Sequence, residues 1–298
     1  MAPMRFRYYC LFLVFILGFL PQDSQAGALG AGELDPSFDN DGLVQTAIDV
    51  SSNIRGLALQ ADGKIVAVGI TTLNGNDFVV ARYNTDGSLD GSFGAGGIVT
   101  TDFSGMDFSD SASSVLILND GKILVGGAAG APNSHTNFAL ARYNPDGSLD
   151  PSFGTGGLVS FDFLGVEAND EILSIALQAD GKIVAAGITN MDRGVAENLF
   201  AIARFNPDGS VDTGFANNGT FTTDFGGGVM SSSTARKVLI RPTGAILVGG
   251  DSDAGGTRDA ALLQLDGSGN PDGNFGTNGM ALTDLGNSEL GRSLALLP

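Results

Sequence analysis

A column of polar residues recurs at one position of a repeated sequence, and its residue types could bind a ligand. The column lies ten residues before a turn in successive copies. Its members are Ser52, Asp110, Asp170, Ser233 and Glu289, and arginines stand three residues later at Arg55, Arg236 and Arg292. Together these groups could hold a cation, a sugar or a peptide terminus. Alternatively, they cap loops or pair between copies, because connectors must satisfy their backbone groups.

Other candidate chemistry has less support in the sequence. Asn144–Asp150 contains closely spaced Asn and Asp residues, as calcium-binding loops do, but it lacks the EF-hand spacing and the bidentate Glu of that loop. His135 is the only histidine, and no nucleophile or carboxylate partner is indicated for it. We therefore predict no catalytic residue, no resident metal and no cofactor, with calcium left open as a turn ligand.

The elements that must position the column belong to an internal repeat. Four copies read Leu57–Phe93, Val115–Phe153, Ile175–Phe215 and a more divergent Val238–Phe275. Their anchor phenylalanines, with Phe38 before them, are spaced by 55, 60, 62 and 60 residues. A fixed period of this size indicates a propeller, a solenoid or an array.

Each copy contains four short apolar segments separated by turn residues. An Asp-Gly turn, such as Ala61-Asp62-Gly63, joins the first segment to the second and predicts a type I′ hairpin. The second segment is almost continuously apolar, as in a strand covered on both faces. The pattern predicts an all-β fold, a β-propeller of four-stranded antiparallel blades. A β-solenoid is the alternative.

The copies differ mainly in two sets of loops. The loops between the second and third segments vary, and so do those that lead from the fourth segment into the next copy. In an antiparallel meander alternate connections lie on the same side, so we expect both variable sets on one face. Variable loops on a uniform scaffold commonly carry a binding site.

The repeat resembles the delta-60 repeat family of exported bacterial proteins. The resemblance rests on ALQADGKIVAVG at 58–69, DFVVARYNTDGSLDGSFG at 77–94 and the ending at 96–103. It covers nearly all of residues 34–298, and the segment order is similar to that of NHL-type propeller blades. The resemblance implies a repeat scaffold with the Leu57 segment innermost, and it implies no catalytic residues.

The phase of the repeat predicts four full blades and an incomplete fifth. Leu43–Ile48 reads as an outer strand without earlier strands of its own blade. Arg292–Leu297 reads as a fifth inner strand. We therefore expect residues 34–298 to form one propeller domain that is incomplete at its C-terminal end.

The first residues predict export. Arg5 and Arg7 precede an apolar run at Cys10–Leu20 and a small-residue cleavage site, as in a signal peptide spanning residues 1–26. A linker follows at residues 27–33. Cleavage removes two basic residues, one acidic residue and the single cysteine, which leaves a net charge of −19. No membrane span is then expected, and so acidic a chain is a poor partner for nucleic acid.

These observations favour a secreted, periplasmic or cell-surface protein. We expect a non-enzymatic repeat scaffold that binds protein or carbohydrate through its variable loops. One alternative is a propeller lyase or hydrolase with a site at the channel mouth, and another is a purely structural surface protein.

Overall fold

The computed structural model describes residues 32–48, 51–72, 75–105, 108–131, 135–165, 168–191, 198–226 and 231–296. The predicted signal peptide, residues 1–26, and most of the linker lie outside these ranges. The secondary-structure elements assigned in the described residues are all β-strands. Helices long and apolar enough to cross a membrane are absent from this part of the chain.

The strands form four consecutive antiparallel meanders, which we call units 1 to 4. Unit 1 contains β1 (Ser52–Leu59), β2 (Ile65–Thr71), β3 (Asp77–Tyr83) and β4 (Ile98–Thr101). Unit 2 contains β5 (Ser111–Ile117), β6 (Ile123–Ala131), β7 (His135–Tyr143) and β8 (Leu158–Phe161). Unit 3 contains β9 (Ala168–Leu177), β10 (Ile183–Met191), β11 (Leu199–Phe205) and β12 (Thr220–Thr223). Unit 4 contains β13 (Ser233–Ile240), β14 (Ile246–Ser252), β15 (Asp259–Leu265) and β16 (Met280–Thr283).

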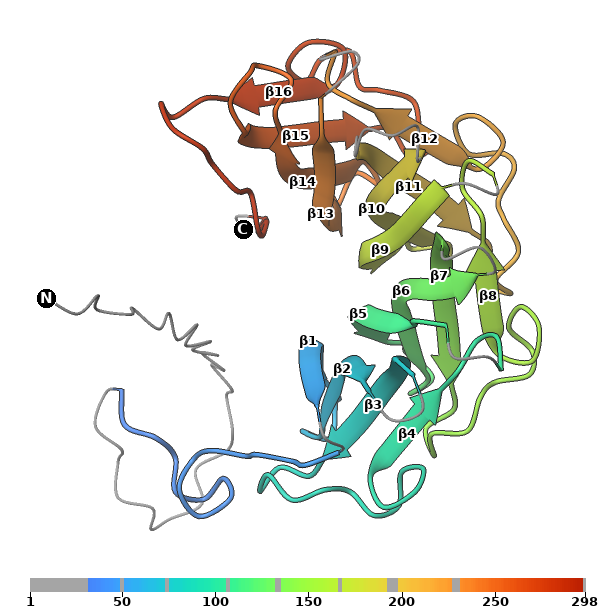
Figure 1. Cartoon of the computed structure of the whole chain (residues 1–298), viewed down its shortest axis with the longest axis vertical. Helices are drawn as coiled ribbons and strands as arrows, with labels where there is room; N and C mark the ends of the chain where they lie inside the picture. The colour runs from blue at the N-terminus through green and yellow to red at the C-terminus, as the bar shows by residue number, and fades with distance from the viewer. Residues whose placement is uncertain are drawn as a thin grey trace, which may run out of the picture.

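The four units are splayed around a common centre, with the first strand of each innermost (Figure 1). One parallel bridge, Thr136 to Asn169, joins units 2 and 3 into a single hydrogen-bonded sheet. An opening separates unit 1 from unit 4, so the arrangement is an arc and not a closed ring (Figure 1). Radial antiparallel sheets are the architecture of a β-propeller, whereas a solenoid would stack its coils in a line.

The hairpins between first and second strands have a longer loop than the predicted type I′ turn. Gly63 has φ 86°, but Asp62 is not among the residues with positive φ, so the turn is not type I′. The Gln60 and Lys64 backbones close a three-residue loop, in which the Gly63 N–H donates to Gln60 O at 3.0 Å. This is a type I turn followed by a left-handed residue, which only glycine adopts without strain.

The hydrophobic core lies between the units and not inside any one of them. Val66, Val68 and Val80 of unit 1 pack with Val115 and Val125 of unit 2, all at most 8% exposed. Two further clusters join unit 2 to unit 3 and unit 3 to unit 4. Each sheet is therefore stabilised by burying its faces against its neighbours.

Residues 32–48 contact unit 1 as the end of each unit contacts the next. The Asp39 N–H donates to Asp86 O at 2.8 Å, and the Gly94 N–H donates to Asp146 O at the same distance. The Tyr83 hydroxyl also lies 2.9 Å from Thr46 Oγ1, as Tyr143 lies 2.8 Å from Thr101. The predicted outer strand at Leu43–Ile48 holds this position, but it is not assigned as a strand.

Residues 290–296 lie where a further inner strand would lie. A Cβ atom on Gly249 would come within 2.7 Å of Leu294, just as one on Gly126 would come within 2.8 Å of Ile175. Leu294 thus packs on unit 4 as Ile175 packs on unit 2. The strand predicted from Arg292 is nevertheless not assigned within the described residues, because no second strand pairs with it there.

Candidate binding face

Strand registers place the variable loops on one side of every unit. In unit 1, Ser52 is paired with Thr71, Thr71 with Asp77, and Phe78 with Thr101. The start of the first strand, the loop between the second and third strands and the end of the fourth strand therefore share one edge. We call this side of the molecule the loop face, and the opposite side, with the Asp-Gly turns, the turn face.

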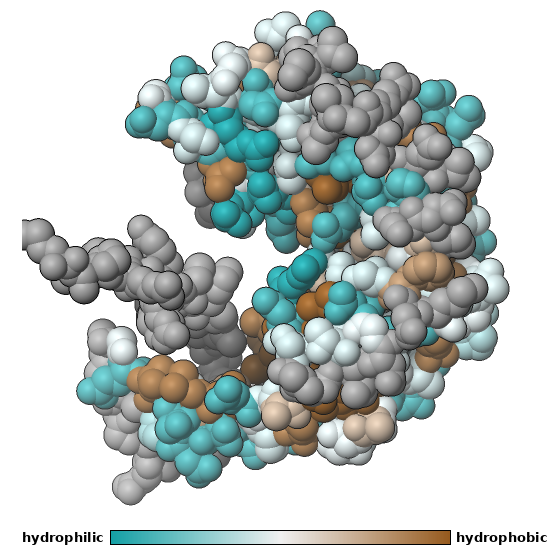
Figure 2. All heavy atoms as spheres, viewed as in Figure 1, coloured by the Kyte–Doolittle hydropathy of each residue, from teal (hydrophilic) through white to brown (hydrophobic). Residues whose placement is uncertain are grey.

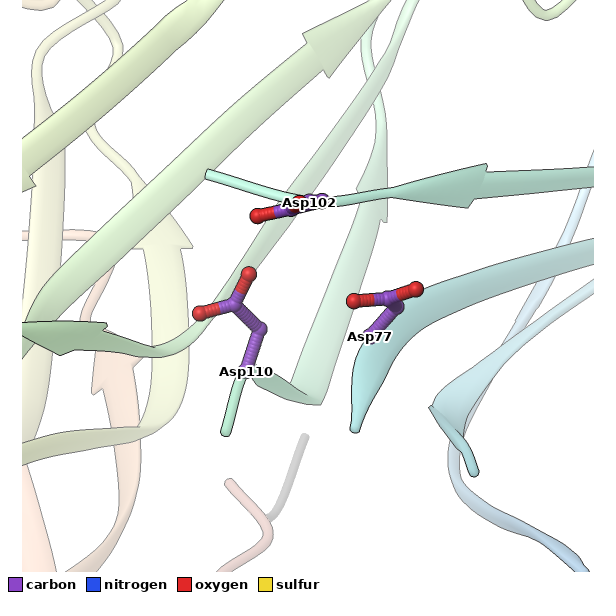
Figure 3. A group of neighbouring side chains, drawn as sticks. All are labelled: Asp77, Asp102 and Asp110. Atoms are coloured by element: carbon purple, nitrogen blue, oxygen red, sulfur yellow. The ribbon is translucent and has the colours of Figure 1, made fainter. Parts of the chain in front are cut away.

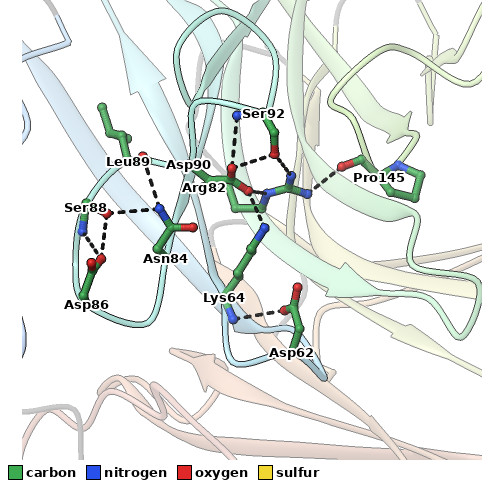
Figure 4. Close-up of polar contacts among 10 residues, drawn as sticks. All are labelled: Asp62, Lys64, Arg82, Asn84, Asp86, Ser88, Leu89, Asp90, Ser92 and Pro145. Atoms are coloured by element: carbon green, nitrogen blue, oxygen red, sulfur yellow. Dashed lines mark hydrogen bonds and ion pairs between the residues drawn. The ribbon is translucent and has the colours of Figure 1, made fainter.

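The turn face carries a repeated polar network (Figure 4). In unit 1, Arg82 Nε and Lys64 Nζ each lie 2.8 Å from Asp90 Oδ2. The Arg82 guanidinium also stacks 4.6 Å above the Phe93 ring and donates to Pro145 O of unit 2 at 2.5 Å. The hydrogen bond from Lys64 is the main reason that the pKa of Asp90 lies well below its usual range.

The same network recurs in units 2 and 3, and unit 4 uses a different set of residues. Arg142 and Arg204 take the place of Arg82. In unit 4, Gln264 donates to Asp272 at 2.7 Å and accepts from Arg241 at 2.6 Å. Because these contacts repeat and reach into the following unit, they fix the scaffold and are not a unique site.

Asp110, a predicted site residue, anchors three loops at the junction of units 1 and 2. It is fully buried, and its oxygens accept the N–H groups of Phe103 and Gly130, each at 2.8 Å. Its own N–H donates to Asn76 O at 2.6 Å. Burial raises the pKa of Asp110 to about 6, with smaller contributions from the nearby carboxylates of Asp102 and Asp77.

Asp170 holds the equivalent position between units 2 and 3. It is fully buried, and Oδ2 accepts the Phe163 N–H at 2.8 Å. Its Oδ1 is buried without a hydrogen-bond partner among the described residues, and the cross-strand Thr189 Oγ1 is in the same state. Burial raises the pKa of Asp170 to about 6, against the opposing effect of the Thr189 hydroxyl.

The other members of the column also lie at junctions. Ser233 is fully buried, and its hydroxyl donates to Ser252 at 2.7 Å. The Ser233 and Glu289 N–H groups donate to the preceding unit at Asn198 O and Arg258 O, each at 2.6 Å. Ser52, at the open end of the arc, is exposed. Asp110, Asp170, Ser233 and Glu289 thus bond to neighbouring connectors, as the alternative interpretation of the column expects. Ligand binding by the column stays a prediction.

The arginines near the axis are partly paired. Arg55 Nη1 lies 3.2 Å from Glu171 Oε1, and the Ser113 hydroxyl donates to the same oxygen at 3.2 Å. These residues come from β1, β5 and β9, so the first strands of three units meet at this point. The Arg55 and Glu171 side chains are 41% and 26% exposed. We call Arg55, Ser113 and Glu171 the axial cluster.

Arg236 is tied to a buried carboxylate. Asp251 is fully buried, and it forms ion pairs with Arg236 and, at 2.8 Å, with Arg258. Arg292 is exposed. Of the three predicted arginines, only Arg55 thus combines a defined partner with large exposure.

Within the described residues, two groups of three carboxylates lie on the loop face, and the sequence prediction contained only one member of each. Asp77, Asp102 and Asp110 offer oxygens within 4.8 Å of one another (Figure 3). Asp259, Asp284 and Glu289 repeat the arrangement at the end of unit 4. Carboxylate oxygens at this separation are the kind of ligands that hard cations such as Ca²⁺ prefer. Asp102 and Asp284 share one position after the fourth strand of their units, but their partners come from other segments of the chain.

Sequence comparison matches parts of the repeat to a family model. Four segments match the model of one β-propeller family. It is described as a domain of unknown function (DUF5122) beta-propeller, and the segments are residues 60–93, 118–153, 178–215 and 241–275. Each matched segment begins directly after a first strand and ends at an anchor phenylalanine. No curated protein matches the chain.

Solved structures show a distant likeness to this chain. A protein of unknown function from Dyadobacter fermentans is 13% identical, with TM-score 0.41, and 71% of this chain covers 60% of it. A PL25 ulvan lyase is 12% identical, with TM-score 0.43, and 73% of this chain covers 53% of it. A GH43 endo-arabinanase from Bacillus licheniformis is 11% identical, with TM-score 0.42, and the coverages are 78% and 79%. The chain thus spans little more than half the length of some of these proteins.

The sequence pattern led us to expect a non-enzymatic protein, and that expectation was wrong. Similar solved structures include a polysaccharide lyase and an arabinanase. The inference failed because the absence of a recognisable catalytic motif in one sequence says little about a site assembled from several units.

Proposed function

We propose that this protein is an exported propeller-type scaffold that binds a protein or carbohydrate ligand on its loop face. The observation that carries the proposal is the asymmetry between the two faces. The turn face repeats the same ion pairs in three units, whereas the loops on the opposite face differ in every unit. A uniform scaffold with one varied face is the usual arrangement of a recognition surface.

The axial cluster, formed by residues in the first halves of three strands that begin at the loop face, is well suited to polar recognition. It combines a guanidinium, a hydroxyl and a carboxylate from three units, and two of these side chains are partly exposed. Sugars and peptides both present hydroxyl, carbonyl or charged groups that pair with such donors and acceptors. Export agrees with the basic start and apolar run of residues 1–26.

We propose further that units 1 to 4 are four propeller blades of the delta-60 type. Residues 43–48 would be the outer strand of a fifth blade, and residues 290–296 would be its inner strand. The proposal is supported by the backbone bond at Asp39 and by the packing of Leu294, both of which repeat contacts made between complete units.

Screening of the full chain on glycan and peptide arrays, followed by titration of the hits, tests the binding proposal. Arg55→Ala and Glu171→Gln should weaken binding, because they remove one donor and one charged acceptor from the axial cluster. Thr85→Ala, an exposed change on the turn face, is the matched control. Equal binding by all three variants would place the ligand elsewhere and refute this assignment.

A further inference from the structure

Each first strand contains a β-bulge at the same place in the repeat. One extra residue of the first strand interrupts its register with the second strand in all four units. A glycine of the second strand is paired with the residue before the extra one, and a Cβ atom there would come within 1.8–1.9 Å of a first-strand carbonyl oxygen. These glycines are Gly69, Gly127, Gly187 and Gly250. Because only glycine permits so close an approach, the bulge is a fixed part of the scaffold.

The extra residue of the bulge is the variable part of an otherwise uniform segment. The residue before it and the residue two places after it are apolar in every unit, and in units 2 to 4 they are at most 8% exposed. The extra residues range from cationic through polar to apolar, and they are Arg55, Ser113, Leu173 and Arg236. A constant backbone position with changing side-chain chemistry is suited to recognition, because folding does not require one residue type there.

Two of these residues, Arg55 and Ser113, belong to the axial cluster, which carries no net charge. The third member, Glu171, balances the charge of Arg55. Among the described residues, the contacts within the cluster use only Nη1 of Arg55 and Oε1 of Glu171. The remaining guanidinium donors and the second carboxylate oxygen are therefore open to a ligand, since both side chains are partly exposed. Figure 2 shows hydrophilic atoms at the inner rim of the arc, where the first strands of these units lie.

A ligand on this cluster must accept a hydrogen bond at one atom and donate one at a neighbouring atom. A guanidinium only donates and an ionised carboxylate only accepts, so Glu171 repels a ligand carboxylate and Arg55 repels a ligand amine. Adjacent hydroxyl groups of a sugar ring satisfy both side chains, because each hydroxyl donates and accepts. Peptides are recognised mainly at sheet edges, in apolar grooves or by clusters of one charge, and the axial cluster is none of these.

We propose that the axial cluster binds a neutral carbohydrate through a pair of adjacent hydroxyl groups. Arg55 donates to one hydroxyl, and Glu171 accepts a hydrogen bond from the other. The bulge of unit 1 carries Arg55, and Glu171 lies two residues before the bulge of unit 3, so fixed backbone positions present both groups to the sugar. The ligand class, an uncharged sugar, rests on the binding function proposed above.

Isothermal titration calorimetry of the full chain with matched probes tests this ligand class. The probes are neutral tetrasaccharides of glucose, galactose or mannose, and the same tetrasaccharides with their primary hydroxyls oxidised to carboxylates. We expect at least one neutral probe to bind, and its oxidised counterpart to bind about tenfold more weakly because of the charge on Glu171. Added salt should leave the affinity for the neutral probe unchanged, since that ligand has no charge to be screened.

Two substitutions separate hydrogen bonding from charge. Arg55→Lys keeps the positive charge but loses the planar fork of donors, so it should weaken binding of the neutral probe by about tenfold. Glu171→Gln should also weaken it, and should narrow the difference between the neutral and the oxidised probe. Thr85→Ala, an exposed change on the turn face, is the control and should alter neither affinity. Circular dichroism spectra of the variants verify that they are folded.

The outcomes distinguish the ligand class from the broader binding function. Tighter binding of the oxidised probes, or neutral binding that Arg55→Lys does not affect, would overturn the assignment of a neutral sugar to the cluster. Absence of binding by every neutral probe would overturn it as well. A peptide or an oxidised probe that then binds in an Arg55-dependent manner leaves the proposed binding function standing, whereas absence of binding by all three kinds of probe counts against both.

Discussion

Removal of one arginine on the turn face should destabilise two units at once. Arg142 and Asp150 are 11% and 6% exposed and lie 2.7 Å apart. The guanidinium also donates to Pro207 O of unit 3 at 2.6 Å and stacks 4.5 Å above the Phe153 ring. Arg142→Ala removes all these contacts, although Lys122 remains 3.0 Å from the carboxylate.

The magnitude follows from the charge that is left behind. Breaking a buried ion pair typically costs 3–5 kcal/mol, since it leaves an uncompensated charge. The remaining lysine places Arg142→Ala at the lower end, about 3 kcal/mol. Urea unfolding should show this as a lower midpoint, with hydrogen exchange increased on both sides of the junction between units 2 and 3.

Unit 4 supplies a matched control for this experiment. In unit 4, Gln264 and Arg241 replace the arginine that contacts the buried aspartate in the other units. The residue of unit 2 at the repeat position of Arg241 is Leu118. Arg142→Gln alone should resemble the alanine variant, whereas Arg142→Gln with Leu118→Arg should recover part of the lost stability. A loss below about 1 kcal/mol for Arg142→Ala, the range of exposed ion pairs, would refute the reasoning.

Three further outcomes are expected. The pKa of Asp170 is raised from 3.8 to about 6, which means that burial of the charged carboxylate costs about 3 kcal/mol of folding stability. This cost is fully present above pH 6 and is relieved as the pH falls towards 4 and the carboxylate is protonated. The free energy of unfolding measured in urea should therefore rise on acidification from about pH 6 to about pH 4. At pH 7, Asp170→Asn should be stabilising, because it removes a buried charge and its amide N–H can donate to Oγ1 of the cross-strand Thr189. Asp110→Asn should not be stabilising, because both of its oxygens accept N–H groups and one would face an amide donor. Paired unfolding curves of the two variants check this contrast. Tyr143→Phe should lower the free energy of unfolding by about 1–2 kcal/mol, because it leaves the buried Thr101 hydroxyl unpaired. Tyr83→Phe removes the hydrogen bond to Thr46, so it should lower the free energy of unfolding by less and increase amide hydrogen exchange only in residues 32–48.

The repeat made the architecture predictable from sequence. Asp-Gly turns and continuously apolar second segments recur with a nearly constant period, and these local signals place each of the four strands within one unit. The prediction was less accurate where the local chemistry allows several turns, as at Gly63, where the hairpin is not type I′. It also assigned strands at 43–48 and 292–297, which lack a pairing partner among the described residues.

The site was harder to predict because its contacts connect different units. The column containing Asp110 and Asp170 was found by comparing copies, but its role depends on N–H groups of loops that precede and follow it. Asp77 and Asp102 were missed as neighbours of Asp110 for the same reason. A single copy of the repeat shows which residues recur, and it does not show which recurring residues meet across a junction.

The placement of the apolar clusters between successive sheets has a consequence for how such a gene can change. Every sheet presents one kind of face to the neighbour before it and a complementary kind to the neighbour after it. Loss of one whole period of DNA would bring together two faces that already fit, and duplication would insert a sheet that matches on both sides. Unequal recombination can therefore alter the number of sheets without first inventing a new interior, provided that the breakpoints respect the period.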